Sequence, residues 1–171
     1  MDSREIGQLL LDRGAVKFGD FLLTSGKRSS YYVDIKDAAT DPAVLTIIAD
    51  AIKQRLSASF IAGVELGAVP ILVAVALMSN TRYIIIRKER KHGTGKLNIG
   101  EIPNGAEVEI IEDVVTTGNS VLKAAKFLRD NGAVVKRVHC IVDREEGGRA
   151  LLLEEGIELM PLVRISEMMS R

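Results

Sequence analysis

The stretch that decides the fold is VEIIEDVVTTGNS, residues 108–120. Its apolar beginning, Val108–Ile111, is typical of a buried strand. A helix is predicted over 119–130, because apolar residues recur there at the spacing of one helical face: Val121, Ala124, Ala125 and Leu128. The residues between these two segments therefore form a strand-to-helix turn.

This turn is rich in hydroxyl groups around Gly118. At a helix N-terminus the backbone N–H groups are free, the helix dipole favours an anion, and Thr and Ser hydroxyls add donors. Glycine allows a tight turn with positive φ and lets a phosphate approach the amides. The turn therefore predicts a cup for a monophosphate, although Thr-Thr-Gly-Asn-Ser is also an ordinary loop composition.

Two adjacent carboxylates, Glu112 and Asp113, come directly before the cup. They would repel a polyphosphate, so we expect them to accept hydrogen bonds from neutral hydroxyl groups nearby. The 2′ and 3′ hydroxyls of a ribose suit this role. The stretch as a whole predicts a site for a phosphorylated sugar.

Composition limits the remaining possibilities. The 171 residues fit one domain, and 23 basic residues balance 23 acidic ones, which gives no general electrostatic case for binding nucleic acid or a membrane. The single cysteine, Cys140, lies in an apolar run and indicates a reducing cytoplasm. The N-terminus lacks the apolar stretch of a secretion signal, and the longest apolar run, residues 68–78, is too short to span a bilayer.

Helices and strands are expected to alternate along most of the chain. A helix over about 3–13 precedes a glycine-punctuated hairpin over 14–34, and Asp41-Pro42 begins a helix that ends near Leu56. Short apolar strands are expected at Phe60–Val64, Tyr83–Ile86, Val108–Ile111, Val138–Val142 and Ile157–Leu162. This alternation predicts the α/β class, a Rossmann-like parallel sheet flanked by helices.

Ligands of such sheets bind outside the carboxyl ends of the strands. Four of the predicted strand ends carry unusual residues, and we expect one site to be assembled from them: 63–70, 87–93, 112–120 and 143–148. The glycines of 63–70 favour either contact with a pyrophosphate or a simple helix entry. The cations of 87–93 favour either a loop that closes over a polyanion or a solvated surface loop.

These segments together resemble the type I phosphoribosyltransferases, whose hallmark is an apolar strand, two acidic residues and a Thr/Gly/Ser phosphate loop. Within the family, residues 18–32 are similar to the base-binding segment of the members that use orotate. The segment 87–93 resembles their mobile catalytic loop, and Asp143-Arg144 resembles their Asp-Arg pair. The resemblance implies a single domain over 1–171, with residues 1–40 contributing a small hood.

The resemblance also implies a reaction. Ribose 5-phosphate would pass from phosphoribosyl pyrophosphate to N1 of orotate, with inversion at C1′ and with Mg²⁺, to give orotidine 5′-monophosphate and pyrophosphate in UMP biosynthesis. The implied catalytic residues are Lys91, His92 and Asp113. No metal ligand is assigned on the protein, because Mg²⁺ would be held mainly by the donor.

The resemblance assigns binding residues position by position. Those implied for the donor are Arg87, Lys88, Lys91, His92, Gly93, Glu112, Asp113, Val114, Val115, Thr116, Thr117, Gly118, Asn119 and Ser120. Those implied for the pyrophosphate loop are Glu65, Leu66 and Gly67, and those for orotate are Thr24, Tyr32, Thr116 and Arg144. Thr24 and Gly67 stand where many relatives have lysine.

Arginine suits the orotate carboxylate, because its planar guanidinium forms paired hydrogen bonds. The alternative for Arg144 is a surface ion pair with Glu145 or Glu146. The resemblance further implies a homodimer in which the loop of one subunit covers the site of the other. Two other functions stay open: a purine phosphoribosyltransferase, and a regulator that binds the same donor together with nucleic acid.

Overall fold

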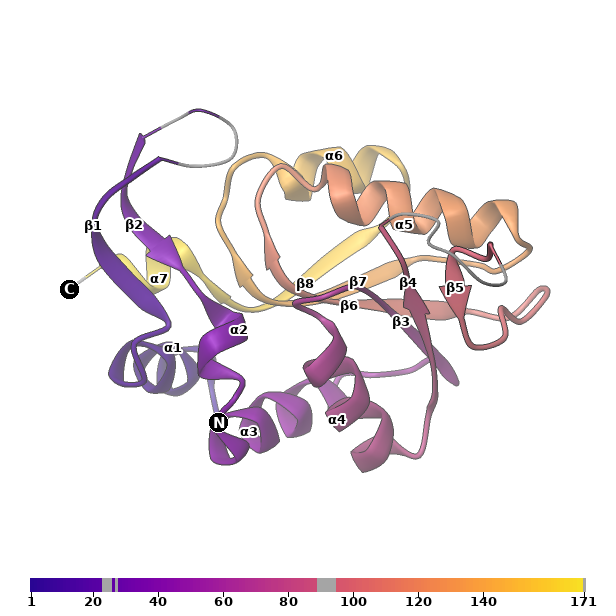
Figure 1. Ribbon diagram of the computed structural model, residues 1–171, viewed down its shortest axis with the longest axis horizontal. Helices are drawn as coiled ribbons and strands as arrows, with labels where there is room; N and C mark the ends of the chain where they lie inside the picture. The colour runs from indigo at the N-terminus through magenta and orange to yellow at the C-terminus, as the bar shows by residue number, and fades with distance from the viewer. Residues whose placement is uncertain (23–25, 27, 89–94, 171) are drawn as a thin grey trace.

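The computed structural model describes residues 1–22, 26, 28–88 and 95–170, and its centre is a six-stranded sheet between two layers of helices (Figure 1). The strand order is β5-β4-β3-β6-β7-β8. Five neighbouring strands are parallel: β4 (Arg82–Ile86), β3 (Phe60–Val64), β6 (Val108–Val115), β7 (Arg137–Asp143) and β8 (Glu158–Arg164). The predicted parallel α/β fold is confirmed. The short edge strand β5 (Asn98–Ile99), antiparallel to β4, was not expected.

Each face of the sheet buries its own apolar cluster. One face is covered by α1 (Ser3–Asp12), α3 (Pro42–Lys53), α4 (Val69–Ser79) and α7 (Ile165–Met169), the other by α5 (Asn119–Asp130) and α6 (Gly148–Glu154). The stripe predicted for α5 is buried against the sheet. Within the described part of the chain, none of these helices combines the length and apolar character needed to cross a bilayer.

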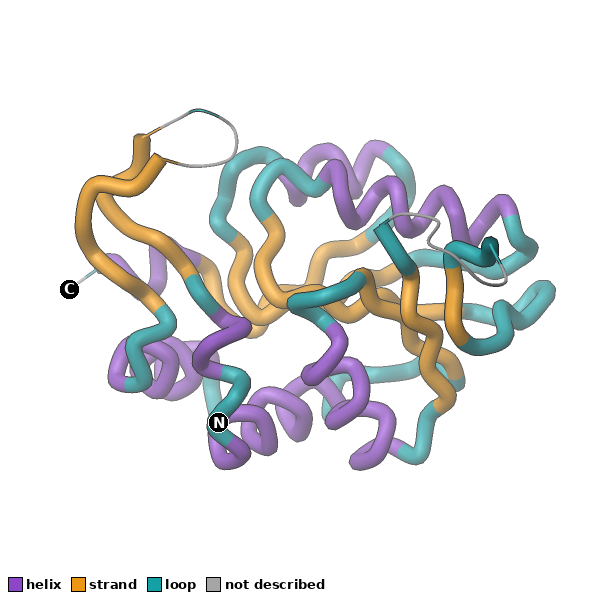
Figure 2. Tube along the Cα trace, in the orientation of Figure 1, coloured by secondary structure: helices purple, strands orange, loops and turns teal. Residues whose placement is uncertain are grey.

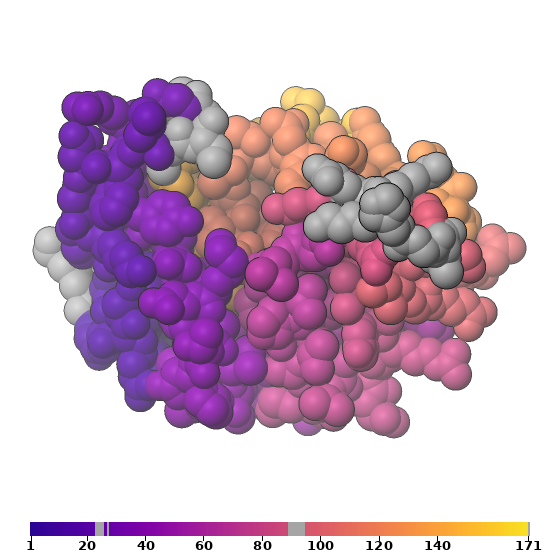
Figure 3. Space-filling model, viewed as in Figure 1, coloured from indigo at the N-terminus to yellow at the C-terminus, as the bar shows by residue number. Residues whose placement is uncertain are grey.

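The N-terminal hairpin forms a second, two-stranded sheet from β1 (Val16–Leu22) and β2 (Arg28–Val33). In the space-filling view its indigo and purple surface covers one end of the molecule (Figure 3). The short helix α2 (Ile35–Ala38) leads from the hairpin back toward the core, and the Asp34 carboxylate caps it by accepting the N–H of Asp37 at 3.3 Å. The hairpin and α2 are therefore one continuous arm beside the sheet.

Two predicted boundaries are wrong. The strand expected to end at Ile111 continues to Val115, because β7 continues beside it and pairs Val114 with Val142. Glu112 and Asp113 therefore lie inside β6 rather than in the loop after it. The helix expected to reach Leu56 ends at Lys53.

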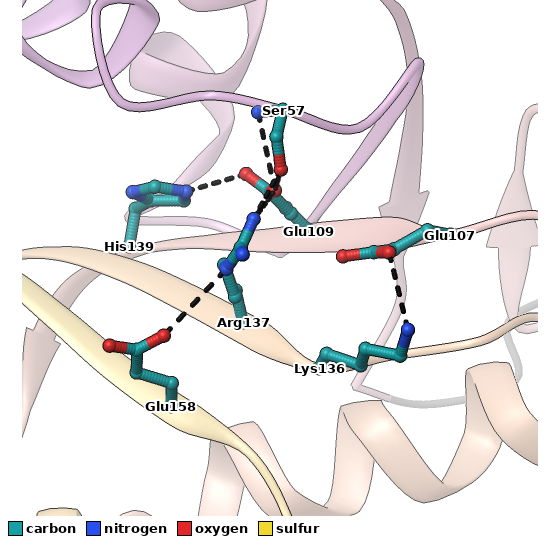
Figure 4. A network of polar contacts seen from close by, with 7 residues as sticks. All are labelled: Ser57, Glu107, Glu109, Lys136, Arg137, His139 and Glu158. Carbon is teal, nitrogen blue, oxygen red and sulfur yellow. Dashed lines mark hydrogen bonds and ion pairs between the residues drawn. The ribbon is translucent and has the colours of Figure 1, made fainter.

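A buried polar network lies near the beginnings of β6 and β7 (Figure 4). Glu109 is fully buried, and its carboxylate lies 2.6 Å from His139 Nε2 and 2.6 Å from the Ser57 hydroxyl. Burial alone would raise the pKa of Glu109, but the hydrogen bonds from His139 and Ser57 outweigh it and lower that pKa to about 2. The ionised carboxylate accepts the hydrogen bond of the His139 ring N–H, so His139, inside β7, has a structural role.

Candidate active site

A cavity of about 510 Å³ opens at the carboxyl ends of β3 and β6. The loops that follow β3, β6 and β7, teal in Figure 2, lie at the ends of these strands that point toward the hairpin. The cavity brings together three of the predicted groups of residues. Its lining comprises Lys36, Val64, Glu65, Leu66, Gly67, Lys88, Glu112, Asp113, Val114, Val115, Thr116, Thr117, Gly118, Asn119, Ser120 and Val121.

The predicted cup is formed by the turn between β6 and α5. Gly118 precedes the helix with φ of 82°, the left-handed conformation expected for it. Among the described residues no side chain caps α5, so its first N–H groups point into the turn without a side-chain acceptor. The side-chain Nδ2 of Asn119 donates to the Thr117 hydroxyl at 3.1 Å and orders the rim of the turn. This arrangement suits a phosphate monoester.

Gly148, which sequence reasoning did not single out, supports the cup from behind. Its N–H donates to the carbonyl oxygen of Thr116 at 3.0 Å. A Cβ on Gly148 would stand 2.7 Å from that same oxygen, and a Cβ on Gly118 would stand 3.0 Å from the Gly148 Cα. The two glycines thus allow two backbone segments to pack directly together, which fixes the position of the cup.

The two carboxylates differ in environment. Asp113 lies beside Lys36, whose Nζ is 3.5 Å from Asp113 Oδ2. Glu112 is buried, and its carboxylate accepts the N–H of Asp113 at 3.0 Å. Burial, with the neighbouring Asp113 carboxylate, raises the pKa of Glu112 well above its usual value. Both side chains face the cavity, where they can accept hydrogen bonds from sugar hydroxyls.

The segment Glu65–Gly67 forms the wall opposite the cup, and it is tied to the base of the basic loop. The carboxylate of Glu65 accepts the N–H of Lys88 at 2.9 Å. Arg87 does not line the main cavity; it lines an adjoining one of about 460 Å³ that shares Lys88 with it. The structure thus places Lys88 inside the site and Arg87 beside it.

Arg144 lies between the sheet and the hairpin, where it is only 8% exposed. Its guanidinium carbon lies 5.0 Å from the ring centroid of Tyr31, and one nitrogen lies 2.8 Å from the Glu146 carboxylate. The predicted alternative is therefore half right: the ion pair with Glu146 exists, but it is not a surface pair. The guanidinium Nε is buried and has no partner among the described residues.

Several residues predicted for the site are not among those that line this cavity. Tyr32 packs against Phe21, with ring centroids 5.8 Å apart, and the aromatic ring that contacts Arg144 is the neighbouring Tyr31. The resemblance implied Tyr32 as an orotate contact, and the sequence alone does not reveal which face of the hairpin each tyrosine occupies. Four further residues lie outside the described ones: Thr24, Lys91, His92 and Gly93.

The family described as "Phosphoribosyl transferase domain" matches residues 35–151. The orotate phosphoribosyltransferase of Thermoplasma acidophilum is 63% identical over 158 residues, which cover 92% of each chain. The crystal structure of orotate phosphoribosyltransferase from Aeropyrum pernix is similar with a TM-score of 0.85 and 32% identity, covering 96% of each chain.

A second solved structure carries a ligand. It is the orotate phosphoribosyltransferase of Mycobacterium tuberculosis in complex with 5-phospho-α-D-ribosyl 1-diphosphate, with a TM-score of 0.79 and 26% identity. The similarity covers 98% of this chain and 99% of that one.

Proposed function

The chain belongs to the phosphoribosyltransferase family and, within it, to the orotate phosphoribosyltransferases, and we propose that the cavity at the ends of β3 and β6 is its active site. The reaction transfers ribose 5-phosphate from phosphoribosyl pyrophosphate to N1 of orotate. The single observation that carries the assignment of the site is that one cavity is lined both by the uncapped N-terminus of α5 and by two carboxylates.

The donor is held at its two ends. Residues 116–120 bind the 5′-phosphate with the free N–H groups of α5 and the hydroxyl groups of the turn. Asp113 and Glu112 accept hydrogen bonds from the ribose hydroxyls. The negative charge of Asp113 also stabilises the positive charge that develops on the ribose ring as pyrophosphate leaves C1′.

The departing pyrophosphate is received by Glu65–Gly67, Lys88 and the basic loop. Lys88 lines the cavity and places a cation there. Arg87, Lys91 and His92 serve the same group, with Lys91 or His92 as the proton donor, by the resemblance of the loop 87–93 to the family's catalytic loop. Neutralising the leaving group lowers the barrier to C1′–O cleavage.

The oxygen-rich site fits Mg²⁺, a hard cation that prefers carboxylate, hydroxyl and phosphate oxygens. Glu112 and Asp113 offer such oxygens beside the sugar, while the diphosphate of the donor would hold most of the ion's ligand positions. When bound, the ion neutralises charge on the pyrophosphate.

Orotate binds on the side of the hairpin, which with the rest of residues 1–40 acts as the hood. Arg144 pairs with the orotate carboxylate, since its guanidinium is already oriented by Tyr31 and Glu146. Thr116 contacts the base from the sheet, and Thr24 and Tyr32 contact it from the hood. N1 of orotate then attacks C1′ from the face opposite the leaving group.

The test is turnover of phosphoribosyl pyrophosphate with magnesium against a panel of orotate, uracil, adenine, guanine and hypoxanthine. Orotate-dependent release of pyrophosphate is expected. Turnover of a purine alone would refute the choice of acceptor, and binding of the donor without turnover of any base would favour a regulatory role.

We propose that the protein acts as a homodimer in the cytoplasm, with the basic loop of one subunit completing the site of the other. The proposal is supported by the match of 87–93 to the family's loop and by the buried, unpaired Cys140, which suits a reducing compartment. Mixing an Arg144→Ala variant with a Lys91→Ala variant tests the shared site. Partial recovery of activity is expected, and no recovery despite demonstrated subunit exchange would contradict it.

A further inference from the structure

Lys36 lines the active-site cavity, although it belongs to the hairpin-α2 arm and not to the parallel sheet. It lies in α2, directly after the hairpin, and its side chain is half exposed. Its Nζ lies 3.5 Å from Asp113 Oδ2 and faces the same cavity as Glu65–Gly67. The helix α2 is not part of the parallel sheet, but Ile35 and Ala38 of the same helix are buried in the core, which holds Lys36 close to β6.

The backbone at Gly67 also approaches this carboxylate oxygen closely. A Cβ at Gly67 would stand only 2.2 Å from Asp113 Oδ2, so position 67 has no room for a side chain beside the carboxylate. The Lys36 ammonium and the Gly67 backbone therefore both lie close to Asp113 Oδ2. The Lys36 ammonium lies next to the segment that receives the pyrophosphate, where Gly67 itself supplies no side chain.

The charge balance of the cavity indicates that the Lys36 ammonium is needed to bind an anion there. Among the described lining residues, three are acidic, Glu65, Glu112 and Asp113, whereas Lys36 and Lys88 are the two cations. A diphosphate entering here adds several negative charges. Burial alone would lower the pKa of Lys36, but Asp113, Tyr32 and Asp34 together outweigh it and raise that pKa, so the ammonium stays protonated at neutral pH.

We propose that Lys36 binds the diphosphate of the donor beside Glu65–Gly67. In the free enzyme the ion pair with Asp113 keeps the Lys36 ammonium in the cavity. When the donor enters, the ribose hydroxyls replace Lys36 as partners of Asp113, and the flexible lysine stem turns the ammonium toward the phosphate oxygens. The inference rests on the proposed function, since it concerns the same cavity.

The experiment compares Lys36→Met and Lys36→Arg with Lys126→Met as a matched control. Lys126 is a similarly exposed lysine in an ion pair, 3.2 Å from Glu155, away from the cavity. Calorimetry with magnesium measures the affinity for inorganic pyrophosphate and, separately, for ribose 5-phosphate. Steady-state kinetics measure KM for the donor and for orotate.

Lys36→Met is expected to weaken pyrophosphate binding and raise the donor KM by roughly tenfold or more, the effect of losing one charge-assisted hydrogen bond. Binding of ribose 5-phosphate and the orotate KM should change by less than about twofold. Lys36→Arg should retain most of the pyrophosphate affinity, and Lys126→Met all of it. Unchanged pyrophosphate affinity in Lys36→Met would overturn the proposal.

An equal loss of pyrophosphate and ribose 5-phosphate affinity would also overturn it, because Lys36 would then only orient Asp113. Failure of the proposed function is separable, since it shows as absent orotate turnover in the wild-type protein. Pyrophosphate binding that depends on Lys36 would survive that result.

Discussion

Gly148→Ala tests whether the contact between two backbone segments positions the phosphate cup. The added methyl group would lie 2.7 Å from the Thr116 carbonyl oxygen and 2.7 Å from Val115 Cγ1, where ordinary contacts begin near 3.4 Å. Neither neighbour can move without displacing the end of β6 or the turn into α5. Overpacking of this kind costs about 1–3 kcal/mol of folding stability.

If the turn shifts to relieve the contact, at least one hydrogen bond to the 5′-phosphate is lost. A hydrogen bond to a charged group contributes about 1.5–3 kcal/mol. The affinity for the donor should therefore fall by roughly 10- to 100-fold. Steady-state kinetics give the donor KM, calorimetry gives the affinity for ribose 5-phosphate, and thermal unfolding gives the change in stability.

Gly7→Ala is the matched control, because a Cβ there meets Val163 Cγ1 at 3.4 Å and lies in the middle of α1. It should leave the donor KM unchanged and should not lower Tm. If Gly148→Ala instead folds normally and keeps a donor KM within about twofold of the wild-type value, the packing of Gly148 against Gly118 does not position the cup.

Three further predictions concern buried charges. Glu112→Gln should raise Tm at neutral pH, by about 2–4 °C for each kcal/mol of folding stability gained. The pKa of Glu112 is higher in the folded protein than in the unfolded chain, so above the unfolded-state pKa this carboxyl group destabilises the fold, and the neutral amide removes that cost. An unchanged or lowered Tm would contradict this. Glu109 should contribute about 3 kcal/mol to the free energy of unfolding, because its pKa is lowered to about 2 in the folded protein; this contribution is complete above pH 4.5 and is lost as the pH falls toward 2. Urea unfolding of Glu109→Gln at several pH values should lack this acid dependence. An unaltered pH profile would refute the prediction. Arg144→Ala should raise the orotate KM by roughly tenfold or more with little change for the donor, and Arg144→Lys should not restore it because lysine lacks the planar fork; equal effects on both substrates would argue against the assignment.

The phosphate cup could be predicted from sequence because it is local. One apolar strand, one glycine and one helical stripe, all within 108–130, specify a strand-turn-helix unit and the direction of its free N–H groups. The parallel sheet could be predicted for the same reason, from short apolar segments that alternate with helical ones. The end of β6 was missed because charged Glu112 and Asp113 resemble a loop, whereas pairing with β7 keeps them in the strand.

The roles of Lys36 and Gly148 could not be found in this way, because they come from contacts between distant segments. Lys36 meets Asp113 only after the arm of the hood folds back on the sheet, and a charged residue in a short helix is usually a surface residue. Gly148 matters only because it packs against Gly118. The position of Tyr31 under Arg144 likewise depends on the face of the hairpin, which composition does not reveal.

The central claim is that one cavity holds the whole donor, with its 5′-phosphate on the turn 116–120 and its diphosphate beside Glu65–Gly67. The most direct test is a crystal structure of the protein with phosphoribosyl pyrophosphate and magnesium. The account predicts the 5′-phosphate within hydrogen-bonding distance of the first N–H groups of α5, and the ribose hydroxyls on Asp113. A donor bound in the reverse direction, or in the adjoining cavity beside Arg87, would contradict it.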